Sequence, residues 1–286
     1  MGLRILFIGD VVGSPGRKIV SQAVPRLIRR WNLGLVVCNA ENAAGGSGIT
    51  ADCHEELAEA GVDVFTMGDH VYRKDDIFAL YDRTDRLLRP ANLPSEAPGP
   101  ESALVEARDG TVVAVFGLLG RVFMKPIDCP FRAADRVIAG LDAAAKVIVV
   151  DFHAEATSEK QLLGRYLDGR VSAVLGTHTH VATADECILP GGTAFQADVG
   201  MTGPYESIIG RKIDRVLSTT LTQVPAYLDV ATGDPRLCGA LIEVDATSGR
   251  ASAIRRIRLD QTEVRRLLTE SAPPGDFDPF APGSTA

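Results

Sequence analysis

The chain has 286 residues, 45% of them hydrophobic, so it can bury a sizeable core and is not a disordered protein. Its formal net charge of −7 gives no basic field for strong binding of polymeric nucleic acid, but a small phosphorylated ligand remains compatible with it. No apolar run reaches the roughly 18 residues that cross a bilayer, and the five cysteines form no C-x-x-C pair, which favours a cytoplasmic protein without disulfides.

The predicted elements alternate between strands and helices over the first 180 residues, which is typical of an α/β core. Continuous apolar runs predict buried strands at residues 3–9, 35–38, 62–67, 111–119, 146–152 and 171–175. Amphipathic or capped segments predict helices at residues 17–31, 50–60, 131–145 and 157–168, the first of them kinked at Pro25.

The remainder of the chain adds hairpins. Hairpin-like segments occur at residues 188–197 and 238–259, with a predicted helix at residues 211–223 between them, so we expect mixed sheets. Residues 271–286 are rich in Pro, Gly and Ala and predict a flexible C-terminal tail. Because no strong linker divides the rest, we predict one domain over residues 1–270.

Side chains that can bind metal follow the predicted strands again and again. Ligands of open α/β sheets gather at the carboxyl ends of the strands, where loops converge. The candidates are Asp10, Glu41, Asn42, Asp69, His70, His153, His178 and His180. Any one of these residues could be a turn, cap or core residue. Their repeated occurrence after predicted strands, taken together, favours a metal site. His178 and His180 are expected to point the same way from an extended segment.

The ligand types indicate two metals. Three imidazoles with three carboxylates exceed what one tetrahedral zinc ion needs. Mixed nitrogen and oxygen ligands suit two divalent or mixed-valence ions, with iron or manganese expected first and zinc as an alternative. Two such ions about 3.5–4 Å apart can clamp both ends of an in-line phosphoryl displacement.

The order of these motifs resembles the calcineurin-like metallophosphoesterases, and its variant form resembles their bacterial YmdB-like branch. The blocks are GDVVG (9–13), NAENAAGG (39–46), GDH (68–70), DFHAEATSEK (151–160), GTHTH (176–180) and DVGMTGPY (198–205). The resemblance runs over roughly residues 3–260. It implies a four-layer α-β-β-α sandwich of two mixed sheets flanked by helices. It also implies a phosphodiesterase for 2′,3′-cyclic nucleotides, with 3′,5′-cyclic nucleotides as a further candidate.

The same resemblance implies a role for each candidate. The first metal would be bound by Asp10, Asn42 and His180. The second metal would be bound by Asp69, His153 and His178. Glu41 would bridge the two ions, and His70 would be the catalytic histidine. One departure is that Asp69 stands where the family pattern has Asn, which adds a negative charge to the site.

We therefore predict a binuclear metal-dependent phosphodiesterase in which a metal-activated hydroxide attacks phosphorus and His70 stabilises charge or protonates the leaving oxygen. The partner would be a small phosphodiester or cyclic nucleotide. The alternatives are a binuclear hydrolase of another bond class and a metal-binding signalling protein with little activity. The sequence leaves a homo-oligomer open. Asp151 could orient a histidine or be a structural residue at a strand end. Arg121 and residues 202–205 could contact the phosphate or base, or form a solvated loop.

Overall fold

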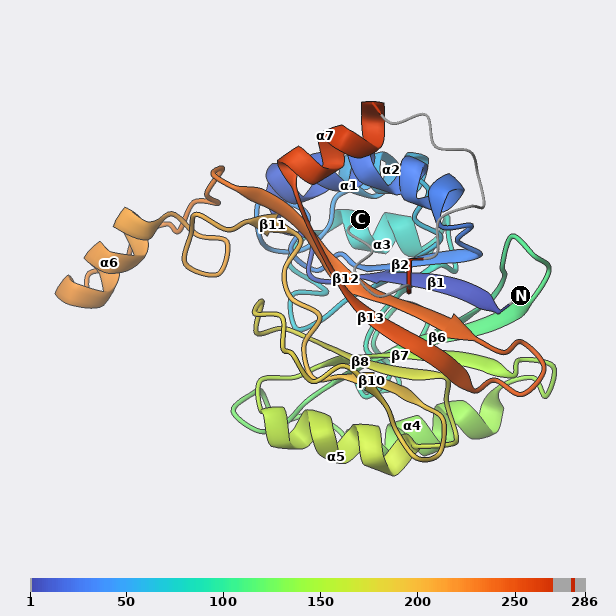
Figure 1. Cartoon of the computed structure of the whole chain (residues 1–286). Coiled ribbons are helices and arrows are strands. Elements are labelled where there is room, and N and C mark those ends of the chain that lie inside the picture. Colours follow the sequence, from blue (N-terminus) through green and yellow to red (C-terminus); the bar gives the residue numbers. More distant parts are fainter. Residues whose placement is uncertain (1, 270–278, 281–286) are drawn as a thin grey trace.

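A computed structural model of the chain describes residues 2–269 and 279–280. Two mixed sheets pack face to face, and helices cover their outer faces, which gives four layers (Figure 1). This is the α-β-β-α sandwich that the motif resemblance implied, and the prediction of mixed sheets is confirmed.

The first sheet has the strand order β11-β12-β1-β2-β3-β4, with β13 beside β12. Its strands are β1 (Leu3–Ile8), β2 (Leu35–Asn39), β3 (Val64–Thr66), β4 (Leu87–Leu88), β11 (Gly203–Pro204), β12 (Pro235–Val244) and β13 (Ala251–Asp260). Strands β1 to β4 are parallel, whereas β12 pairs with β1 and β13 in antiparallel fashion. The parallel strands therefore end at a common edge.

The second sheet has the order β5-β6-β7-β8-β10-β9. Its strands are β5 (Ser102–Glu106), β6 (Val112–Leu119), β7 (Val147–His153), β8 (Ala173–Thr177), β9 (Cys187–Ile188) and β10 (Ala194–Gln196). Strands β6, β7, β8 and β10 are parallel, and the edge strands β5 and β9 are antiparallel to their neighbours.

Helices cover each sheet on its outer side (Figure 1). Those on the first sheet are α1 (Gly13–Arg30), α2 (Ala51–Glu59), α3 (Asp76–Tyr81) and α7 (Gln261–Thr269). Those on the second sheet are α4 (Pro130–Gly140) and α5 (Thr157–Leu167). Helix α1 begins at Gly13 rather than residue 17 and continues through Pro25. None of the helices in the described part of the chain is long and apolar enough to cross a membrane.

Three apolar clusters lie between the four layers. Strand β1 shows why its sequence is continuously apolar. Ile5 and Phe7 face the cluster between the sheets, whereas Leu6 and Ile8 face the cluster beneath α1. A strand that is buried on both faces needs apolar residues at every position, and each such side chain contributes about 1.5–3 kcal/mol of burial free energy.

Helix α6 (Ile213–Thr222) lies apart from these layers, at the end of an arm that projects from the body (Figure 1). None of its residues is buried. Its large apolar side chains Ile213, Leu217 and Leu221 are 41%, 51% and 80% exposed. Their spacing of four residues places them on one face of the helix.

The predicted tail at residues 271–286 lies outside the described residues, apart from Pro279 and Phe280. Phe280 packs against the cluster beneath α1 and α7, and its ring centre is 5.9 Å from the guanidinium carbon of Arg4. The tail and the single domain over residues 1–270 both stay predictions.

Candidate metal centre

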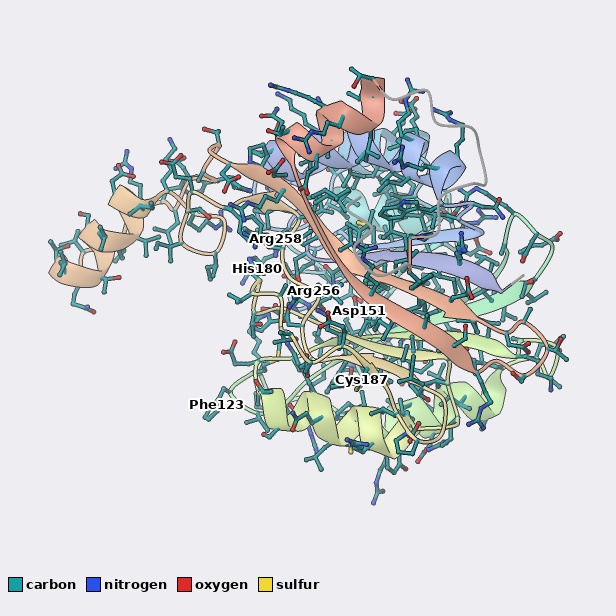
Figure 2. The ribbon with its side chains drawn as sticks, in the orientation of Figure 1. Phe123, Asp151, His180, Cys187, Arg256 and Arg258 are labelled. Carbon is teal, nitrogen blue, oxygen red and sulfur yellow. The ribbon has the colours of Figure 1, made fainter. Side chains whose placement is uncertain are left out.

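The candidate ligands meet at the edge where the parallel strands of both sheets end. Each follows or ends a strand: β1, β2 and β3 in the first sheet, and β7 and β8 in the second. Figure 2 shows His180 among the loops at this edge. The side chains of Asp10, Glu41, Asn42 and His153 are buried, whereas those of Asp69, His70 and His178 are 24–28% exposed. The predicted convergence of these residues is therefore present.

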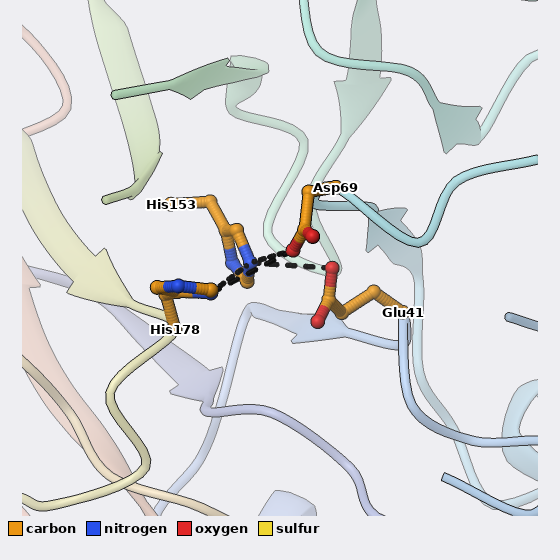
Figure 3. Close-up of side chains that lie close together, drawn as sticks. All are labelled: Glu41, Asp69, His153 and His178. Atoms are coloured by element: carbon orange, nitrogen blue, oxygen red, sulfur yellow. Dashed lines mark hydrogen bonds and ion pairs between the residues drawn. The ribbon is translucent and has the colours of Figure 1, made fainter. Parts of the chain in front are cut away.

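Four of the candidates form a tight cluster (Figure 3), made of Glu41, Asp69, His153 and His178. Each contributes one ligand atom, and these atoms lie within 4.8 Å of one another. The Nε2 atom of His153 is central: it is 3.2 Å from a Glu41 oxygen, 3.3 Å from an Asp69 oxygen and 3.0 Å from His178 Nδ1. Two imidazoles and two carboxylates at this spacing could hold a metal ion.

Asp10, Asn42 and His180 lie next to this cluster. His180 Nε2 is 3.8 Å from Asp10 Oδ1 and 3.2 Å from Asn42 Nδ2. The amide nitrogen of Asn42 also donates to Glu41 Oε1 at 2.9 Å. The amide nitrogen of Asn42 thus faces His180. The amide oxygen could bind a metal at this position only if the side-chain amide were rotated by half a turn.

The electrostatics of Asp10 fit a cation. Its carboxylate is fully buried, and Oδ1 has no hydrogen-bond partner among the described residues. Burial raises the pKa of Asp10 to about 6. A buried carboxylate oxygen without a partner is costly, and a metal ion would remove that cost.

The clustered side chains balance one another's charges. Burial alone would raise the pKa of Glu41, but the imidazoles of His153 and His70 hold it well below its usual range. Burial alone would likewise lower the pKa of His153, but the carboxylates of Glu41, Asp69 and Asp10 raise it well above its ordinary value. The carboxylates and imidazoles of the cluster thus favour each other's charged forms.

His153 is oriented through Thr177 by Asp151, which the sequence left as either an orienting or a structural residue. The hydroxyl of Thr177 donates to Asp151 Oδ1 at 2.7 Å, so its oxygen can accept a hydrogen bond from the Nδ1–H of His153, which is 2.8 Å away. Asn39 and Thr66 donate to the other oxygen of Asp151, and this carboxylate is fully buried. The chain from Asp151 to His153 fixes the tautomer that leaves Nε2 facing the cluster.

The segment of His178 and His180 is not extended, so that expectation is wrong. Both residues have positive φ values, 96° and 66°, which L-residues seldom adopt. The Asp198 carboxylate holds the turn, because it accepts from the Thr179 amide at 3.1 Å and from the Thr179 hydroxyl at 2.7 Å. Lys160 pairs with the same oxygen at 2.7 Å, and both partners are buried. These two residues were missed as contributors to the site, although both lie in the motif blocks.

His70 lies beside the four-residue cluster. Its Nδ1 is 2.9 Å from Asn42 Oδ1 and 3.2 Å from Glu41 Oε1, and its backbone N–H donates to the other Glu41 oxygen at 3.2 Å. The hydrogen bond with the Glu41 carboxylate raises the pKa of His70. Its Nε2 is 3.9 Å from Asp69 Oδ2, too far for a hydrogen bond. The geometry favours an imidazolium with Nε2–H available to a substrate.

The other residues whose roles the sequence left open have structural contacts. The backbone N–H of Arg121 donates to Glu159, and the Arg121 side chain is exposed. Thr202 is buried, and its backbone N–H donates to the Asp10 carbonyl at 2.9 Å. The Tyr205 hydroxyl donates to the carbonyl of Met201 at 3.0 Å.

Comparison with known proteins gives consistent matches over nearly the whole chain. A sequence model of the YmdB-like protein family matches residues 6–257. A Bacillus subtilis (strain 168) protein named 2′,3′-cyclic-nucleotide 2′-phosphodiesterase is 46% identical over 258 residues, which cover 90% of this chain and 97% of that protein.

Two crystal structures are similar in fold and sequence. A hypothetical protein from Thermus thermophilus has a TM-score of 0.85 at 41% identity, over 90% of this chain and 99% of that chain. A phosphatase from Mycoplasma pneumoniae has a TM-score of 0.85 at 32% identity, over 94% of this chain and 98% of that chain.

Proposed function

The chain belongs to the YmdB-like protein family, and we propose that it is a binuclear metal-dependent phosphodiesterase acting on 2′,3′-cyclic nucleotides. The observation that carries this proposal is the cluster of Glu41, Asp69, His153 and His178, with Asp10 and His180 close by, at the strand ends of a chain that is 46% identical to a named phosphodiesterase. With 3′,5′-cyclic nucleotides the same chemistry would apply, so these form a second substrate class to test.

We propose that two donor sets hold one ion each. Asp69, His153 and His178 would hold one, Asp10, Asn42 and His180 would hold the other, and Glu41 would bridge them. Nitrogen and oxygen donors without thiolates suit iron or manganese. When bound, such ions supply Lewis acidity at the phosphate and lower the pKa of a coordinated water. The buried, unsatisfied oxygen of Asp10 supports this assignment.

His70 would act on the leaving group. Hydrolysis of a 2′,3′-cyclic phosphate adds water across one P–O bond, and the departing ribose oxygen is an alkoxide that needs a proton. The raised pKa of His70 favours the protonated form, and Nδ1 is held by Asn42 and Glu41. Proton donation from Nε2 to the ribose oxygen would leave the nucleoside monophosphate as product.

The proposed activity is tested with protein stripped of metal and reloaded with Mn²⁺ or Fe²⁺. Adenosine 2′,3′-cyclic phosphate, adenosine 3′,5′-cyclic phosphate, a linear dinucleotide and an aryl amide are then compared. We expect metal-dependent opening of the 2′,3′-cyclic ester, absent in Glu41→Gln. Hydrolysis of the amide alone would point to a hydrolase of another bond class. Metal binding without turnover of any substrate would favour a signalling protein.

We also propose a homo-oligomer in which α6 of one copy packs against α6 of another. In an antiparallel pair related by a twofold axis, Leu217 would meet its own copy and Ile213 would meet Leu221. A lone helix of this length is marginal in water, so its apolar face needs a partner. Light scattering should show a smaller assembly for Leu217→Asp than for Ser218→Asp, which adds the same charge beside the stripe. Equal masses for the two variants would refute the pairing.

Finally, we propose a cytoplasmic location. All five cysteines are free thiols, and Cys38, Cys53 and Cys238 are buried, as expected of a protein from a reducing compartment. Cell fractionation would test this, and recovery outside the cytoplasm would contradict it.

A further inference from the structure

A cavity of about 730 Å³ lies next to Asp69, at the same edge as the candidate metal centre. It is formed by the segments after β3 and β4 and by the loop between β6 and α4. Its wall includes Tyr72, Leu93, Met124 and Ile127. Cavities of this size with mostly apolar walls are typical binding sites for small molecules.

We propose that this cavity binds the base of the nucleotide, stacked on the ring of Tyr72. The inference rests on the proposed function, because that function puts the phosphate at Asp69 and Glu41. Asp69 belongs both to the four-residue cluster and to the cavity wall. In a 2′,3′-cyclic nucleotide only the ribose separates the phosphate from the base, so the base of a bound substrate reaches the neighbouring cavity.

Tyr72 presents a ring that is already fixed. Its hydroxyl donates to the carbonyl of Pro98 at 2.7 Å. The ring stacks with that of Phe78, with centroids 5.8 Å apart and planes inclined by 11°. Phe78 does not line the cavity, so it supports the Tyr72 ring without filling the space. Aromatic side chains held in this way stack on nucleobases of any kind.

The part of the wall formed by the loop between β6 and α4 is also held in place. Near the start of the loop after β6, the buried Glu159 carboxylate accepts from the N–H groups of Arg121 and Val122 at 3.0 and 3.1 Å. Near its end, the buried amide of Asn92 donates to the Asp128 carbonyl at 3.0 Å. A wall fastened at both ends loses little conformational freedom when a ligand binds.

The cavity wall carries charges of both signs. Arg73 and Lys125 line it and are exposed, and the carboxylates of Asp69 and Asp128 line it as well. The case for base binding therefore rests on the apolar wall and the Tyr72 ring.

The experiment compares two substrates of the metal-loaded protein that differ only in the base. One is adenosine 2′,3′-cyclic phosphate, and the other is the 2′,3′-cyclic phosphate of methyl riboside. Tyr72→Ala should raise KM for the adenosine ester about tenfold or more, whereas its effect on the base-free ester should be several times smaller. Tyr72→Phe keeps the ring and should restore most of the loss. Met124→Ala, in the loop between β6 and α4, should likewise raise KM more for the adenosine ester than for the base-free ester.

The matched control is Phe123→Ala. Phe123 is 89% exposed at the tip of the same loop and does not line the cavity; Figure 2 shows it at the margin of the molecule. This variant should leave KM for adenosine 2′,3′-cyclic phosphate within about twofold. Equal losses of Tyr72→Ala on both substrates, or no loss on either, would overturn the base-binding proposal.

A binding measurement separates this proposal from the proposed function. Calorimetric titration with adenosine 3′-monophosphate should give about tenfold weaker binding to Tyr72→Ala than to the wild type. If the wild type hydrolysed neither ester but bound the nucleotide more tightly than Tyr72→Ala, the proposed activity would be wrong and the cavity assignment would stand. If hydrolysis occurred and Tyr72→Ala bound the nucleotide as tightly as the wild type, the cavity assignment would be wrong.

Discussion

Replacing Lys160 with methionine should destabilise the fold and loosen the turn that carries His178 and His180. Lys160 and Asp198 form an ion pair at 2.7 Å, and their side chains are only 3% and 2% exposed. The same Asp198 oxygen holds the amide and the hydroxyl of Thr179. Methionine has a similar length but no charge, so Lys160→Met leaves a buried carboxylate without its cation.

The size of the effect follows from what remains around Asp198. Removing one partner of a buried ion pair costs about 3–5 kcal/mol. Asp198 keeps three hydrogen bonds, from Thr179 N–H, the Thr179 hydroxyl and Gly200 N–H, so we expect the lower end, about 3 kcal/mol. For a chain of this size, this lowers the melting temperature by about 6–12 °C. Because the turn carries two proposed ligands, metal affinity should also fall, by about 10–100-fold.

Differential scanning calorimetry of the metal-free protein measures the first effect without involving the metals. The control is Lys18→Met, an exposed lysine of α1, which should change stability by less than about 0.5 kcal/mol. Adding Asp198→Asn to Lys160→Met removes the unpaired charge and should restore part of the stability. If Lys160→Met melted like the control, the buried pair would not hold the turn, and the reasoning would be refuted.

Three further changes test other parts of the account. His70→Ala should keep near-native metal content and lose roughly 10²–10⁴ in kcat, whereas loss of a metal would make His70 a ligand. Thr177→Val removes the link between Asp151 and His153 and should weaken metal binding about 10–100-fold, as measured by metal titration. Unchanged metal affinity would show that this link does not orient His153. Phe280→Ala should lower the melting temperature by about 2–4 °C, as expected for a loss of about 1 kcal/mol of packing. An unchanged value would show that Phe280 adds nothing to the core.

The sheets could be predicted from the sequence because most of their central strands are buried on both faces. Continuous apolar runs marked β1, β2, β6, β7 and β8 within a few residues of their ends. Elements that were not predicted include α3, β4, β5, β11 and α7. Strands of two residues, such as β4 and β11, are too short to show any periodicity.

Helix α7 did carry a sequence signal. Asp260 accepts from the backbone N–H of Glu263 at 2.8 Å, and the Glu263 carboxylate accepts from the N–H of Asp260 at 2.7 Å. This is a capping box with Asp in place of Ser or Thr, and the D-x-x-E spacing is visible in the sequence.

The residues that gather at the site could be predicted, but their conformations could not. A polar residue after each strand is a local pattern, and the parallel strands bring the ends together. The positive φ values of His178 and His180 depend instead on Asp198 and Lys160, which are distant from the turn in sequence. The proposed base-binding cavity could not be predicted from the sequence either, since ordinary apolar residues from three separate segments form much of its wall.

Turnover as a function of bound metal tests the central proposal most directly. Metal-free protein is titrated with Mn²⁺, and bound metal per chain is measured alongside hydrolysis of adenosine 2′,3′-cyclic phosphate. Two donor sets that share Glu41 predict that activity rises with occupancy and levels off at about two ions per chain. Full activity at one ion per chain, or none at two, would contradict the proposal.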